Sequence, residues 1–131
     1  MGVTFFHFKL STMKNQSNVV EYNFEASAFN WEIAPGKTIE AWGFNKQLPG
    51  PVLRANAGDT LVVRITNNLK EATTIHWHGI CLPAAMDGTD GVQKPIEPGE
   101  VFEYRFVVRD AGTFWYHAHT NETVQMERGM Y

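Results

Sequence analysis

Thr73-Thr74-Ile75-His76-Trp77-His78-Gly79 is the stretch that decides the fold, together with Trp115-Tyr116-His117-Ala118-His119 further along the chain. The two segments hold four of the five histidines. Successive side chains of a β-strand point to opposite faces, so the two histidines of each segment share one face at a spacing of roughly 6.5 to 7 Å. The four are His76, His78, His117 and His119.

Two imidazoles on one face of a strand form a metal-ligand pattern. Imidazole nitrogen suits zinc, copper, iron and nickel, and bonds of about 2 Å let two such strands, side by side, surround more than one ion. A single histidine on a strand is more often a packed residue that hydrogen-bonds to a backbone carbonyl. Two pairs favour ligation, because both lie in apolar or aromatic segments where polar rings without partners are unfavourable to bury. We therefore predict a cluster of metal ions held by these four side chains.

Apolar residues alternate with the histidines in both segments. Ile75 and Trp77 face away from the first pair, and Phe114 and Tyr116 do the same for the second. We expect Trp77 to fill the core and these residues together to hold the two strands rigid, as a metal site requires.

From residue 19 onward the chain has strand patterns separated by turn sequences. Residues 60–66 place Leu61, Val63 and Ile65 on one face. Residues 100–108 alternate in the same way, and the inward residues are Phe102, Tyr104, Phe106 and Val108. Pro-Gly turn sequences separate the segments, and no helical period of useful length occurs. This pattern predicts an all-β fold, an antiparallel β-sandwich or Greek-key barrel.

Length and composition limit the function classes. A chain of 131 residues is the size of one domain. With 14 acidic and 11 basic residues and no run of like charge, we expect neither nucleic acid nor an anionic membrane as a partner. No run approaches about 20 apolar residues, and no secretory signal pattern is visible. The single cysteine, Cys81, excludes an internal disulfide, and we expect a small buried or rim thiol.

Further motifs occur in order around the histidines. They are Trp31-Glu32-Ile33-Ala34-Pro35-Gly36, His76-Trp77-His78-Gly79, Met86-Asp87-Gly88, Pro95-Ile96-Glu97-Pro98-Gly99, Gly112-Thr113-Phe114-Trp115-Tyr116-His117-Ala118-His119 and Arg128-Gly129-Met130-Tyr131. This ordered set resembles the first cupredoxin domain of a laccase-type multicopper oxidase. The resemblance covers residues 19–131 and implies a cupredoxin-like Greek-key fold, with residues 1–18 as an N-terminal extension or remnant.

The resemblance implies a function and assigns roles. In that family a type 1 copper takes electrons from a phenolic, aromatic amine or metal-ion substrate, and a trinuclear copper cluster reduces dioxygen to water. The first domain supplies half of the cluster's histidines: His76 would bind the type 2 copper, and His78, His117 and His119 the type 3 pair. Asp87 matches the acidic residue that delivers protons near the cluster, although Asp87-Gly88 alone is also an ordinary turn sequence. A periplasmic or secreted location is expected by the same resemblance.

The sequence also departs from the family pattern. A type 1 site needs a cysteine within a His-Cys-His arrangement, and Cys81 is followed by Leu82 and Pro83 instead. Family domains continue after the Gly-Met-Tyr segment into another apolar strand, whereas this sequence stops at Tyr131. We therefore expect a fragment that lacks its last strand, that belongs with one or two further cupredoxin domains, and that is inactive alone.

Three other classes of protein match part of this histidine pattern. A cupin-type iron or manganese enzyme needs a glutamate shortly after His-x-His, where Leu82 and Pro83 stand. A zinc hydrolase leaves the fourth histidine unexplained and offers only Asp87 as a general base. A non-catalytic module that binds or stores copper remains open, because four histidines hold copper without any redox partner.

Overall fold

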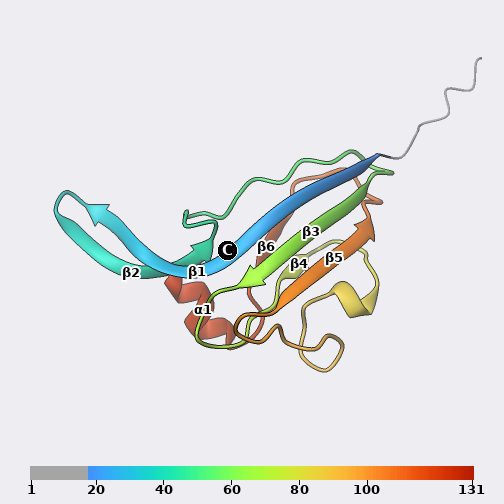
Figure 1. Cartoon of the computed structure of the whole chain (residues 1–131). Helices are drawn as coiled ribbons and strands as arrows, with labels where there is room; N and C mark the ends of the chain where they lie inside the picture. The colour runs from blue at the N-terminus through green and yellow to red at the C-terminus, as the bar shows by residue number, and fades with distance from the viewer. Residues whose placement is uncertain (1–17) are drawn as a thin grey trace, which may run out of the picture.

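The computed structural model describes residues 18–131, which form a mainly β fold (Figure 1). The elements in order are β1 (Val19–Ala34), β2 (Lys37–Phe44), β3 (Thr60–Asn67), β4 (His76–His78), the 3-10 helix η1 (Ala84–Met86), β5 (Val101–Val107), β6 (Trp115–His117) and α1 (Glu122–Arg128). β2, β1, β3 and β5 form one sheet in that order, and β4 and β6 form a second sheet of two strands. The expected N-terminal extension falls, except for residue 18, outside the described residues.

The long strand β1 pairs with a different strand along each half of its length. Its first half pairs with β3 in parallel, from Val19 opposite Thr60 to Ala26 opposite Asn67. Its second half pairs with β2 in antiparallel fashion, and this hairpin extends beyond the rest of the sheet (Figure 1). The prediction of an antiparallel β-sandwich or Greek-key barrel was therefore wrong in the pairing of β1 with β3, while the other strand pairs are antiparallel. A parallel pair needs a long return connection, and β2 with residues 45–59 provides it.

The two sheets enclose the core between them. The Trp77 ring of β4 lies edge-on to Tyr104 and Phe106 of β5, at centroid distances of 5.4 and 5.3 Å. Tyr116 of β6 reaches Phe24 of β1 at 5.5 Å. Offset and edge-to-face pairs of this kind stabilise a core beyond the area they bury. The predicted role of Trp77 as core filler is confirmed, since only 2% of its surface is exposed.

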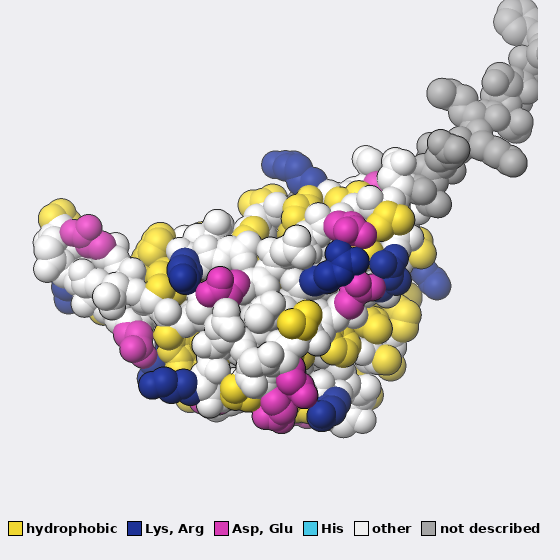
Figure 2. Space-filling model, in the orientation of Figure 1, with side chains coloured by type: hydrophobic (Ala, Val, Ile, Leu, Met, Phe, Trp, Pro, Cys, Tyr) yellow, Lys and Arg dark blue, Asp and Glu magenta, His cyan; other side chains and the backbone are white. Residues whose placement is uncertain are grey.

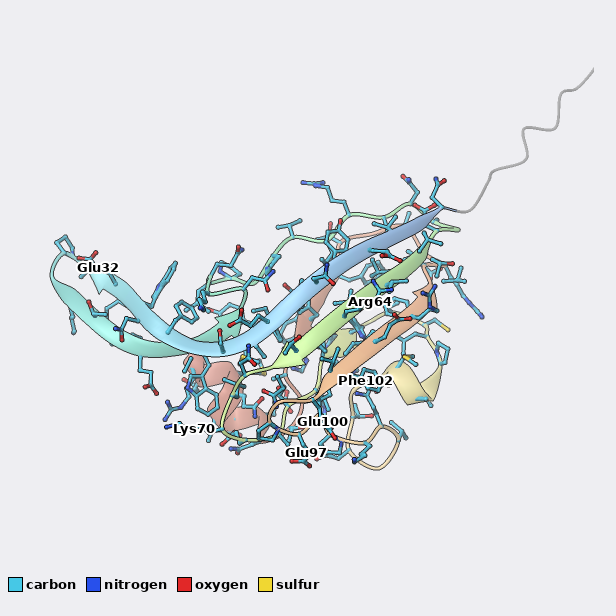
Figure 3. The ribbon with its side chains drawn as sticks, viewed as in Figure 1. Glu32, Arg64, Lys70, Glu97, Glu100 and Phe102 are labelled. Atoms are coloured by element: carbon cyan, nitrogen blue, oxygen red, sulfur yellow. The ribbon has the colours of Figure 1, made fainter. Side chains whose placement is uncertain are left out.

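The alternation predicted for β3 holds on its core side, where Leu61, Val63 and Ile65 are buried. Val62 is buried as well, although the pattern placed it on the outer face. Arg64 on the same face forms ion pairs with Glu21 and Glu103, at 3.0 and 2.8 Å. We attribute the burial of Val62 to such long side chains on its face, because their stems lie along apolar surface. Acidic and basic side chains lie next to one another over this face (Figures 2 and 3).

Three further features differ from the sequence-based expectations. Residues 122–128 form the helix α1, where no helix was predicted. Phe114 is 41% exposed, so it does not serve as a core support in the way Trp77 does. Cys81 is exposed, so of the two positions expected for it, buried or at the rim, the buried one is wrong. Within residues 18–131, no helix is long and apolar enough to cross a membrane.

Candidate metal centre

β4 and β6 place the histidines on one side of a short two-stranded sheet. The strands are antiparallel, with His76 opposite His117, Trp77 opposite Tyr116, and His78 opposite Trp115. Because side chains alternate along each strand, Trp77 and Tyr116 enter the core while the histidines share the other face. The prediction that the two His-x-His segments form adjacent strands is confirmed.

Three of the histidines meet closely enough to share a metal ion. His76, His78 and His117 each offer a ring nitrogen, and these nitrogens lie within 4.8 Å of one another. The fourth predicted histidine, His119, lies two residues beyond the end of β6. Its ring centroid is 5.3 Å from that of His76 and 6.0 Å from that of His117. The structure therefore brings all four predicted residues together, with the first three forming the tightest group.

Asp87 lies against the first of these histidines. The Nδ1 atom of His76 is 2.8 Å from the Asp87 carbonyl oxygen and 3.4 Å from Oδ2 of its carboxylate. Both oxygens are acceptors, so Nδ1 carries the proton and Nε2 is left to bind a metal. The carboxylate also accepts a hydrogen bond of 2.8 Å from the Thr89 hydroxyl. Asp87 is thus where the sequence predicted it, in a loop beside the histidines.

A buried polar network fixes the loop that carries Asp87. The Gly88 N–H donates to Oε1 of Gln93 at 2.9 Å, and Nε2 of Gln93 donates to the Tyr104 hydroxyl at 2.9 Å. That hydroxyl also accepts the Ile75 N–H at 2.7 Å, one residue before β4. Burial raises the pKa of Tyr104 to about 12, so it stays a neutral phenol. The same network therefore holds both His76 and its neighbouring carboxylate.

His117 is buried and is held in its neutral form. Its Nδ1 lies 2.9 Å from the Ala118 carbonyl oxygen and 3.5 Å from Oε1 of Glu122. Burial lowers the pKa of the His117 imidazole, and this outweighs the opposing effects of the Ala118 carbonyl and the Glu122 charge. Neutral imidazole is the form that ligates metal ions, so the environment of His117 suits a ligand.

His119 presents a polar atom that lacks a partner. Its Nδ1 is buried and has no hydrogen-bond partner among the described residues. Its Nε2 lies 3.9 Å from Oε2 of Glu122. Buried polar atoms are almost always satisfied, so an orphaned imidazole nitrogen next to other imidazoles fits a site that takes a metal.

Trp115 restricts the rings of two histidines. Its side chain stacks on His117 at a centroid distance of 4.3 Å and on His78 at 4.9 Å. Trp115 and Glu122 are site residues that the sequence analysis did not single out. The signal for Trp115 was its two-residue spacing from His117, which places it on the histidine face. Glu122 gave no signal on its own, because its position depends on the unpredicted helix.

The donor set limits the chemistry of the site. Among the described residues, the close group of potential ligands contains histidines and no cysteine. Imidazole donors suit copper and zinc, whereas a blue type 1 copper centre requires a thiolate. The arrangement can hold one or more imidazole-bound ions next to the Asp87 carboxylate.

Comparison with known proteins agrees with this geometry. A family model described as multicopper oxidase matches residues 25–131. Copper resistance protein A from Escherichia coli is 46% identical over 97 residues, which are 73% of this chain and 16% of that protein. L-ascorbate oxidase from Cucurbita pepo var. melopepo is 42% identical over 119 residues, which are 88% of this chain and 21% of that protein.

A solved structure shares the fold. The multi-copper oxidase from Pseudomonas thermotolerans superimposes with a TM-score of 0.85 at 46% identity, over 88% of this chain and 28% of that one. The chain spans 16% and 21% of the length of the two curated relatives. The family model matches most of the residues of this chain, and the fold is cupredoxin-like. The chain therefore belongs to the multicopper oxidase family and is an N-terminal cupredoxin domain of that family.

Proposed function

We propose that this domain forms half of the oxygen-reducing centre of an oxidase that takes electrons from phenols or metal ions. The observation that carries the proposal is the pairing of β4 with β6, which sets His76 opposite His117 on a common face. His76 would hold the type 2 copper, and His78, His117 and His119 would hold the type 3 pair. Copper bound there would supply the one-electron redox chemistry by which dioxygen is reduced to water.

The protein's own groups orient the ligands and handle protons. The Asp87 carbonyl and carboxylate hold the proton of His76 on Nδ1, which directs Nε2 toward the centre. The side chain of Asp87 is 28% exposed, so its carboxylate reaches both solvent and the histidine. Reduction of dioxygen consumes protons, and a carboxylate in this position can pass them inward through a water or two.

A groove in the domain supports the expectation of a further strand. It has a volume of about 720 Å³, and its wall includes residues 49–57, residues 110–116 and Tyr131. The Gly50 N–H donates to the Tyr131 carbonyl at 2.7 Å, and the Ala118 N–H donates to the Met130 carbonyl at 2.9 Å. The carbonyl groups of the last two residues thus accept hydrogen bonds from two segments that are far apart in the chain. We propose that the last strand of the cupredoxin sandwich lies in this groove.

The remaining parts of the proposed enzyme lie in other domains. One or two further cupredoxin domains would provide the other cluster histidines and the type 1 copper with its cysteine. Dioxygen and a small phenolic, aromatic or metal-ion reductant would be the substrates. A periplasmic or secreted location is proposed from the family alone.

The test uses the full-length oxidase that contains this domain. Oxygen consumption with a phenol and with ferrous iron should be lost in His78→Ala and His119→Ala. Cys81→Ala should retain it, because the exposed thiol is outside the ligand group. Asp87→Asn should slow oxygen reduction and leave the oxidation of the reductant intact in single-turnover measurements. Full turnover in both histidine variants would reject the proposed centre, and unchanged oxygen reduction in Asp87→Asn would reject its proton role.

A further inference from the structure

Glu122 is a second carboxylate at the histidine cluster, beside His117 and His119. It is the first residue of α1, and its Oε1 lies 3.5 Å from Nδ1 of His117. Its Oε2 lies 3.9 Å from Nε2 of His119. One carboxylate therefore faces both histidines of the second His-x-His segment.

The helix that carries Glu122 is anchored to the strand segment of the first histidines. Gln125 of α1 is fully buried, and its Oε1 accepts a hydrogen bond of 2.7 Å from the Thr73 hydroxyl. Its Nε2 donates to the Ala72 carbonyl at 2.8 Å and to Glu71 at 2.9 Å. A satisfied buried network of this kind fixes the helix relative to β4. The place of Glu122 is thus set by the fold as well as by its own contacts.

His119 has few other polar neighbours to orient its ring. Among the described residues its Nδ1 has no hydrogen-bond partner, and Glu122 is the one residue with a carboxylate oxygen within 4.0 Å of a ring nitrogen. His117 has a second acceptor, the Ala118 carbonyl at 2.9 Å. Loss of the Glu122 carboxylate would consequently affect His119 most, and His117 to a smaller degree.

We propose that Glu122 is a positioning residue for copper binding, which orients His117 and His119 as Asp87 orients His76. The inference rests on the proposed copper site and adds a residue to it. Histidines that bind metals usually donate their other N–H to a carboxylate or carbonyl, and removal of that partner weakens metal affinity by about 10-fold to 100-fold. The Glu122 carboxylate lies 3.5 Å from a ring nitrogen of His117 and 3.9 Å from one of His119, so it is placed to act on two candidate ligands at once.

The experiment measures Cu(II) affinity of the 131-residue chain by competition with a chelator. Glu122→Ala is compared with Glu127→Ala, which removes an exposed carboxylate from the same helix. We expect an affinity loss of about 10-fold to 100-fold in Glu122→Ala and wild-type affinity in Glu127→Ala. Glu122→Gln, which keeps an acceptor oxygen, should lie between them. Pulsed electron paramagnetic resonance should show fewer bound imidazoles in Glu122→Ala.

Two further measurements separate the alternative explanations. The far-ultraviolet circular dichroism spectrum and the sedimentation profile of the metal-free chain should be the same in Glu122→Ala and Glu127→Ala. Lost secondary structure or added association in Glu122→Ala that accounts for the affinity loss would overturn the positioning role in favour of a structural one. Equal affinity in the two alanine variants would also overturn it and leave the copper site standing. If the wild-type chain binds no copper, or if His117→Ala and His119→Ala bind it unchanged, the proposed copper site fails as well.

Discussion

Each imidazole of the metal centre has two nitrogens, and the acceptor beside it decides which one is free to bind a metal. For His76 the acceptor is Asp87, and for His117 it is the Ala118 carbonyl, helped by Glu122. The spacing of the histidines predicted their shared face, because the two-residue repeat of a strand depends on local geometry alone. The role of Glu122 could not be predicted in this way, since it depends on where a helix docks.

At the residue scale, Gly88 permits the close approach of the Asp87 loop to β4. Its φ is +78°, and a Cβ there would overlap the Ile75 carbonyl and lie 2.8 Å from the His76 nitrogen. Gly88→Ala should lower the free energy of unfolding by more than ~2 kcal/mol, because backbone strain and overlap act together. Chemical denaturation at equilibrium measures this loss.

Gly36→Ala is the matched control for that prediction. Gly36 has a φ of +71°, but a Cβ there would have no atom within 4 Å. It should lose only about 1 kcal/mol, because the strain of the positive φ acts alone. Equal losses in the two variants would show that the contact between Gly88 and Ile75 is unimportant.

At the element scale, the sequence patterns predicted neither α1 nor the parallel pairing of β1 with β3. The helix is only 7 residues long, and Gln125 is its only buried residue, so no repeating apolar stripe marks it. Glu122 in its first turn, Arg128 in its last turn and Gly129 as its cap are the weak signals that were present. The pairing of β1 with β3 depends on the path of the whole intervening segment, which local patterns do not encode.

The docking of α1 depends on Gln125. Gln125→Leu should keep the volume of the side chain but leave the Thr73 hydroxyl and the Ala72 carbonyl without their partner. We expect a loss of about 1–3 kcal/mol in the free energy of unfolding, the usual result of unsatisfied buried groups. Val124→Ala, at a residue of the same helix that is 39% exposed, should change stability by less than ~0.5 kcal/mol. A Gln125→Leu variant as stable as Val124→Ala would contradict the proposed anchoring.

At the scale of the whole molecule, the sequence predicted the all-β class and the meeting of the two histidine strands. Both follow from alternation, which is visible in short segments. Such patterns could not predict the groove beside β6, because its walls come from segments far apart in the chain. Those walls include exposed Val52, Phe114 and Trp115, which leaves apolar surface and backbone groups open to pairing.

We expect the 131-residue chain alone to self-associate or to melt at low temperature with poor cooperativity. An open groove of this kind is a template for pairing with another chain. Sedimentation measurements over a range of concentrations, together with thermal unfolding followed by circular dichroism, test this expectation. A monomer that unfolds in one sharp transition would count against the proposed missing strand.

The proposal that this chain holds only half of a copper centre is tested most directly by loading the purified 131-residue chain with Cu(II). Its visible spectrum is then recorded, and its oxygen consumption is measured with a phenol and with ferrous iron. We predict copper binding that weakens in His78→Ala and His119→Ala, because four imidazoles form only part of the proposed cluster. We also predict no intense blue absorption and no turnover, because a blue centre requires a thiolate ligand and the only cysteine, Cys81, is outside the histidine group. An intense blue band, or turnover that disappears in the two histidine variants, would contradict the account and require a complete catalytic centre within this chain.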